Sequence, residues 1–110
     1  MPKPSAIAIG AHPDDIEFYM AGTLLQLQAV GWAIHYFNLS SGNLGSVKMA
    51  PEKTALTRSS EARQAAQVLG ATYHSSICRD LEILYTVPTL RKVAAAIRKS
   101  KASIVLTHSP

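Results

Sequence analysis

Cysteine and long apolar runs are both scarce in this sequence, and each absence excludes a kind of protein. Cys78 is the only cysteine among 110 residues, so an internal disulfide is excluded and a reducing compartment is favoured. No apolar stretch approaches the ~18 residues that a membrane span needs. The N-terminal residues lead straight into a short apolar segment without a signal-peptide cleavage pattern. We therefore expect a cytoplasmic protein with no membrane span.

Acidic residues are also few, with seven Asp and Glu against eleven Lys and Arg, for a net charge of +4. Much of the excess lies in one C-terminal stretch, at Arg91, Lys92, Arg98, Lys99 and Lys101. Such a stretch can bind nucleic acid, or it can be the solvated face of a helix whose C-terminus favours cations. No aromatic residues alternate with these cations to stack on bases. We expect the solvated face, and no nucleic-acid partner.

Apolar runs alternate with amphipathic segments along the whole chain. The pattern predicts strands over 5–11, 32–39, 71–77 and 102–107, and helices over 16–30, 51–69 and 89–99. Gly31 and Gly70 mark the ends of the first two helices. Strands that alternate with helices indicate an α/β fold, a Rossmann-like and mainly parallel sheet flanked by helices. We see no repeat or inter-domain linker, so residues 1–110 belong to one domain.

Polar residues follow several of the predicted strands. Open parallel sheets bind ligands beyond the carboxyl ends of their strands, and these ends carry residues 12–15, the loop 40–46, Asp80 and His108. The second helix runs back over the sheet, so Arg58 and Glu61 near its start should point toward the same edge. Alternatively, Arg58 and Glu61 form a surface ion pair worth only a few tenths of a kcal/mol.

The stretch Ala11-His12-Pro13-Asp14-Asp15-Ile16-Glu17 concentrates an imidazole and three carboxylates. Asp14 and Glu17 have the spacing of a helix capping box, which is one explanation. Three neighbouring carboxylates repel, however, and a bound cation would relieve the repulsion. His12 and Asp15 are suitable metal ligands, and Asp14 could then take a proton from water. We favour the metal site over simple capping.

This stretch resembles the signature of the LmbE-like, or PIG-L, zinc-dependent deacetylases. The likeness continues at Ala21-Gly22-Thr23-Leu24, at Ser41-Gly42-Asn43 with Gly45-Ser46, at Arg58 with Glu61, at Ala65 to Gly70, and at Thr107-His108-Ser109-Pro110. It covers essentially the whole chain in the right order.

The resemblance implies hydrolysis of an N-acetyl group from an N-acetylglucosamine-type conjugate. It implies that His12 and Asp15 bind zinc, or another divalent metal, and that Asp14 is the general base. Arg58 and Asp80 match positions that contact the sugar conjugate. Glu17, Glu61 and His108 are then candidates for the surroundings of the metal site.

Two features depart from the pattern of the family. Asn43 occupies a loop position that often carries an acid. The third zinc ligand of the family is a histidine shortly after the Thr-His-Ser-Pro segment, and this chain ends before it. We therefore expect residues 1–110 to be the N-terminal part of a larger domain, inactive alone, and associated with the rest of its own chain or with a second copy. His108 is expected to neighbour the site, and His35 and His74 to be structural.

One alternative from another class stays open. A non-catalytic sugar- or nucleotide-binding α/β module would explain the polar sheet edge without a third histidine. A dinucleotide-binding loop is disfavoured, because the first turn lacks the Gly-x-Gly-x-x-Gly pattern.

Overall fold

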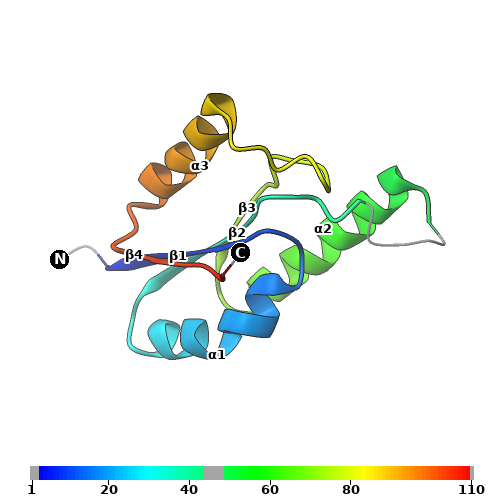
Figure 1. The fold of residues 1–110 in the computed structure, drawn as a ribbon. Helices are drawn as coiled ribbons and strands as arrows, with labels where there is room; N and C mark the ends of the chain where they lie inside the picture. Colours follow the sequence, from blue (N-terminus) through cyan, green and yellow to red (C-terminus); the bar gives the residue numbers. More distant parts are fainter. Residues whose placement is uncertain (1–2, 44–48, 110) are drawn as a thin grey trace.

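The computed structural model describes residues 3–43 and 49–109, and in these residues it shows a four-stranded sheet and three helices (Figure 1). The elements are β1 (Ser5–Gly10), α1 (Asp15–Ala29), β2 (Ala33–Asn38), α2 (Pro51–Val68), β3 (Thr72–His74), α3 (Val87–Ser100) and β4 (Ile104–Leu106). All neighbouring strands pair in parallel, in the order β3-β2-β1-β4. The predicted parallel α/β fold is therefore confirmed.

The two central strands are buried on both faces, and side chains alternate between two cores. Figure 1 shows α1 and α2 on one face of the sheet and α3 on the other. Ala8 and Tyr36 pack in the core beneath α1 and α2, which also contains Ile16, Leu24 and Ala62. The opposite core is smaller and comprises Ile7, Ile9 and Phe37, against which Val93, Ala96 and Ile97 of α3 pack.

The predicted stops of the first two helices are confirmed, since α1 ends at Ala29 and α2 at Val68. Gly31 and Gly70 have φ angles of 95° and 64°, which only glycine adopts without strain. In α3, Leu90 is 42% exposed and lines a groove on the outer surface with Ala94, whereas Val93 and Ile97 pack on the smaller core.

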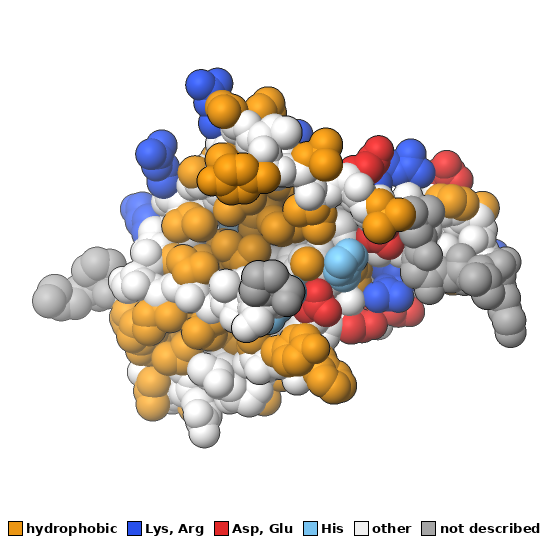
Figure 2. Space-filling view, viewed as in Figure 1, with side chains coloured by type: hydrophobic (Ala, Val, Ile, Leu, Met, Phe, Trp, Pro, Cys, Tyr) orange, Lys and Arg blue, Asp and Glu red, His pale blue; other side chains and the backbone are white. Residues whose placement is uncertain are grey.

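The edge strands are shorter than the sequence predicted. β3 and β4 have three residues each, and among the described residues β3 pairs with β2 and β4 pairs with β1. Val105 of β4 remains 45% exposed, and Leu84, Tyr85 and Val87 near the start of α3 are also exposed. Apolar side chains accordingly spread over this side of the surface in Figure 2. Among the helices described, none is both long and apolar enough to cross a membrane.

Candidate functional site

The strand order reverses between β1 and β4, and their carboxyl ends meet at the switch point. β1 pairs with β2 on one side and with β4, which comes about 100 residues later in the chain, on the other. Ligands of doubly wound sheets bind in the crevice at such a point. The segment that follows β1 here is His12 to Asp15, and the segment that follows β4 is Thr107 to Ser109.

His12 and Asp15 lie side by side at this point. The backbone N–H of His12 donates to Asp15 Oδ2 over 3.0 Å, and His12 Nδ1 lies 3.7 Å from the same oxygen. Two ligands of a tetrahedral zinc at 2.0–2.2 Å are separated by about 3.4 Å. The pair therefore has a spacing that one metal ion could bridge with a small adjustment of the half-exposed imidazole.

His108 adjoins the pair from β4 but has its nitrogens engaged. The N–H of Ala11 donates to His108 Nε2 over 3.1 Å, and His108 Nδ1 lies 2.8 Å from the carbonyl oxygen of Ser109. Nδ1 therefore carries the proton and Nε2 accepts. Nε2 is also 3.4 Å from Asp15 Oδ2. This arrangement favours a supporting role for His108 over metal ligation, because its one unprotonated nitrogen already accepts from the N–H of Ala11, directly after β1.

Asp14 adopts a left-handed backbone conformation, with φ 81° and ψ −20°. Asp14 precedes α1 as its N-cap but does not form the hydrogen bond of a capping box, because its side chain accepts none from the first turn of the helix. Its carboxylate instead lies 3.3 Å from Nη2 of Arg58, which also donates to the carbonyl of Pro13 over 3.1 Å. Left-handed geometry in a residue other than glycine is uncommon and gathers at functional sites.

Glu17 is bound by residues that sequence reasoning missed. The hydroxyl of Tyr36 donates to the Glu17 carboxylate, and Asn38 Nδ2 donates to the oxygen of Tyr36 over 3.4 Å. Burial raises the pKa of Glu17. The hydrogen bond from Tyr36 partly offsets this increase, and the charge of Asp14 adds a smaller one. Burial and the Glu17 bond also raise the pKa of Tyr36. Because side chains alternate along a strand, the sequence did place Tyr36 and Asn38 on the same face of β2, and this was the signal that could have linked them.

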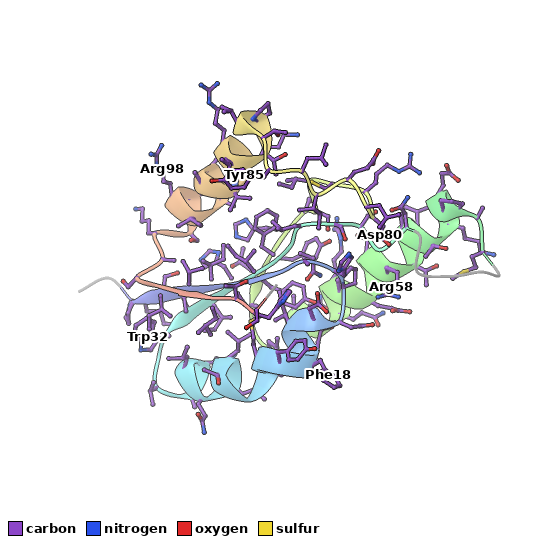
Figure 3. All side chains as sticks on the ribbon, in the orientation of Figure 1. Phe18, Trp32, Arg58, Asp80, Tyr85 and Arg98 are labelled. Carbon is purple, nitrogen blue, oxygen red and sulfur yellow. The ribbon has the colours of Figure 1, made fainter. Side chains whose placement is uncertain are left out.

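Asp80 forms hydrogen bonds with the loop that follows β2. Its Oδ1 accepts from the Ser40 hydroxyl over 2.8 Å and from the Gly42 backbone N–H over 3.0 Å. Its own N–H donates to Asn43 Oδ1 over 2.7 Å. Arg58 and Asp80 lie at the same end of the sheet, as Figure 3 shows. The Gly45-Ser46 part of the predicted loop lies outside the described residues.

Glu61 is separate from this group. It is exposed, and it makes no hydrogen bond or ion pair with Arg58 or with another described site residue. The expectation that both side chains point into the site therefore holds for Arg58 alone. The physical reason is helical pitch, because a step of three residues turns Glu61 about 60° off the stripe that carries Arg58.

The structure thus brings together an imidazole, two carboxylates and a guanidinium at one edge of a parallel sheet. Figure 2 shows a histidine among acidic and basic side chains there. Within residues 3–43 and 49–109, no cluster of three or more His, Cys, Asp or Glu is arranged to hold a metal ion. His12 and Asp15 have the donor types that a divalent metal takes, and they are two where a catalytic site usually has three. Fold and site together define an α/β protein with a polar centre at the switch point of its sheet.

Comparison with known proteins identifies the family. Residues 7–110 match the PIG-L family, described as GlcNAc-PI de-N-acetylase, and the chain belongs to this family. It resembles the 4-oxalmesaconate hydratase of Pseudomonas putida with 29% identity over 115 residues, covering 98% of this chain and 45% of that protein.

Two solved structures extend the comparison. The 4-carboxy-2-hydroxymuconate hydratase GalB of Pseudomonas putida superposes with a TM-score of 0.87 and 28% identity, over 96% of this chain and 47% of that one. The N,N′-diacetylchitobiose deacetylase of Pyrococcus horikoshii gives a TM-score of 0.85 and 25% identity, over 92% and 39%. The chain spans less than half the length of these relatives.

Proposed function

We propose that the whole protein is a metal-dependent hydrolase that removes an N-acetyl group from an amino-sugar conjugate. The observation that supports it most is the grouping of His12, Asp14 and Asp15 at the carboxyl end of β1, with Arg58 against Asp14. Membership of the PIG-L family and the likeness to a diacetylchitobiose deacetylase support the same reaction.

Each residue has a distinct role in this proposal. His12 and Asp15 hold the metal, which is zinc or another divalent ion. When bound, such an ion supplies a Lewis acid that polarises an acyl carbonyl and acidifies water. Asp14, whose side chain is 68% exposed, accepts the proton from the attacking water. Arg58 holds Asp14 and the Pro13 carbonyl in place and lies where a sugar conjugate would bind.

The proposal also concerns the extent of the domain. We propose that residues 1–110 are the N-terminal part of one larger domain, and that a third metal ligand comes from outside them. Catalytic zinc sites usually have three protein ligands, and His12 and Asp15 are two. His108 is unsuited to be the third while its Nε2 accepts from Ala11.

A hydratase is the second candidate, since the Pseudomonas putida matches described above carry hydratase names, at 28–29% identity. Addition of water to a carbon–carbon double bond uses the same two elements, an activated water and a base. The two reactions differ in their products. A deacetylase releases acetate and a free amine, whereas a hydratase removes a conjugated double bond and its ultraviolet absorbance.

The test uses the complete protein, purified with zinc and without it, and its Asp14→Asn variant. We expect acetate release from N,N′-diacetylchitobiose, lowered by roughly 10²–10⁴-fold in Asp14→Asn because the amide cannot accept a proton. Elemental analysis should show equal zinc in both proteins. Near-normal turnover by Asp14→Asn would remove this residue from the mechanism. Loss of ultraviolet absorbance from an unsaturated carboxylic acid, with no acetate release, would favour the hydratase, and binding without turnover would favour the non-catalytic module.

A further inference from the structure

The side of α1 that faces away from the sheet is apolar. Phe18 and Leu25 are 83% and 45% exposed, and Gly22 and Ala29 are exposed as well. The spacing of these four residues, i, i+4, i+7 and i+11, places them in one row along the helix, which we call the outer stripe. Figure 3 shows Phe18 projecting from α1 on the side away from the sheet.

A second apolar stripe on the same helix already packs against the sheet. It consists of Met20, Leu24 and Leu27, which belong to or pack against the core beneath α1 and α2. α1 is therefore apolar on two opposite sides. A surface helix normally has one such stripe, and a helix that is apolar on both sides is usually buried on both. A continuous exposed apolar row marks an interaction site.

Charged residues are missing from the outer stripe and its surroundings in the sequence. No Asp, Glu, Lys or Arg occurs from Phe18 to Val47. By contrast, the exposed residues of α2 include Lys53, and those of α3 include Arg91 and Lys92. The chain has a net charge of +4, so two copies repel each other where such cations meet. The outer stripe lets two copies meet without this repulsion, and it offers no complement to a charged partner.

The order of large and small residues makes the outer stripe complementary to itself. In an isologous interface, residue i of one copy contacts residue j of the other, and j contacts i. If two copies of α1 pack antiparallel with Leu25 against Gly22, the same register sets Phe18 against Ala29. Each large side chain then meets a small one. Within one copy a Cβ at Gly22 would have no atom within 4 Å, so the space above it is open.

The handedness of the connections argues against a further strand and helix of the chain as the occupant. α1 and α2 lead from β1 towards β3 and lie on one face of the sheet, whereas α3 leads back past β1 to β4 and lies on the other face (Figure 1). Such connections are almost always right-handed, so the direction of travel sets the face. A further parallel strand beside β4 would continue in the direction of α3, and its helix would cover the α3 face.

We propose that the outer stripe of α1 is an isologous, antiparallel interface between two copies of this protein. The proposal is independent of the reaction that the protein catalyses. A helix of 15 residues is about 22 Å long, so the contact belongs to the small end of specific interfaces. We therefore expect a weak dimer, with a dissociation constant of micromolar order.

The first test measures the mass of the complete protein by analytical ultracentrifugation from about 1 to 300 µM, a range that spans such a constant. Leu25→Glu places a carboxylate in the outer stripe. Thr23→Glu is the matched control, because it adds the same charge to an exposed position of α1 that a two-residue step turns about 200° away. Phe18→Glu, at a position that is 83% exposed, is a second stripe variant in case Leu25→Glu does not fold.

We expect the wild type and Thr23→Glu to dimerise equally, and the stripe variants to dimerise at least about tenfold more weakly, a loss of ~1.4 kcal/mol. If other surfaces also associate, the stripe variants should form assemblies of half the wild-type mass. A monomeric wild type would assign the stripe to another occupant and would overturn the proposal. Equal association of Thr23→Glu and the folded stripe variants would overturn it as well.

The second test separates a specific register from general apolar adhesion. Gly22→Leu makes the stripe more apolar, so simple adhesion would become stronger. In the proposed register two leucines would instead collide, and we expect dimerisation to weaken about tenfold. Adding Leu25→Ala to Gly22→Leu again sets a large side chain against a small one, and should bring the dissociation constant back to within about threefold of the wild type. A stronger dimer in Gly22→Leu, or no recovery in the double variant, would refute the register.

Discussion

The pair His35 and His74 should make the stability of the fold depend on pH. His35 Nδ1 and His74 Nε2 are 2.8 Å apart, which is a hydrogen bond between two neutral imidazoles on β2 and β3. Burial lowers the pKa of both residues, and for His74 the nearby His35 and Lys99 lower it further. In the unfolded chain both take up protons near the ordinary pKa of 6.5.

The sign follows from the lowered pKa values. Just below pH 6.5 the unfolded state binds more protons than the folded state, so stability falls as pH falls and is fully present above that pH. Each proton taken up only by the unfolded state contributes at most about 1.4 kcal/mol per pH unit. Two imidazoles set an upper slope of about 2.7 kcal/mol per pH unit, and charging both would place two cations in contact.

Urea unfolding followed by circular dichroism, at steps between about pH 7.5 and 5, measures this slope. His74→Gln removes one titrating group, and we expect it to reduce the slope by up to half. His12→Gln is a control, because it removes a half-exposed imidazole that is not part of the His35–His74 pair. The difference between variants also cancels the contribution of Glu17, whose raised pKa acts in the opposite direction. Equal slopes for His74→Gln and the wild type would refute the reasoning.

Two further predictions concern Gly42 and Arg58, which both contact Pro13 beside the site. Gly42→Ala should destabilise the protein by about 1–3 kcal/mol, since φ is 72° and the added Cβ would lie 3.0 Å from the Pro13 ring. Gly22→Ala, in an open position of α1, should instead stabilise the protein by roughly 0.5–1 kcal/mol. Thermal unfolding of both variants measures the difference, and similar changes in stability would contradict the strain argument. Arg58→Met should raise KM and lower kcat in acetate release while zinc content stays constant, because the thioether donates no hydrogen bond to the Pro13 carbonyl or to Asp14; unchanged kinetics would show that the guanidinium does not position the base.

Periodicity was a reliable guide wherever burial decided the structure. The apolar runs at β1 and β2 predicted central strands, because these side chains must leave water whatever the details of the loops. The lengths of β3 and β4 were overestimated, since an apolar run indicates burial and not how many of its residues pair in the sheet.

The site was less predictable because it depends on contacts between distant segments. Spacing suggested that Asp14 would cap α1, but the left-handed backbone turns its carboxylate to Arg58, 44 residues away. Tyr36 and Asn38 looked like ordinary strand residues, and only the fold shows that they bind Glu17 in a chain of hydrogen bonds. The partners of a polar group are set by tertiary structure, which a local pattern does not encode.

The position of β4 beside β1 has a consequence for how the chain folds during its synthesis. Ala11 is bound by His108 across 97 residues, and the carbonyl of Ile9 accepts from the Thr107 hydroxyl across 98. At a translation rate of about 5–20 residues per second, roughly 5–20 s separate the emergence of these partners from the ribosome. During that interval one edge of β1, an apolar strand, has no neighbour to pair with, and such an edge is prone to aggregate. The nascent chain should therefore depend on chaperones most until β4 emerges, and the segment that carries His12 and Asp15 should take its final shape only then.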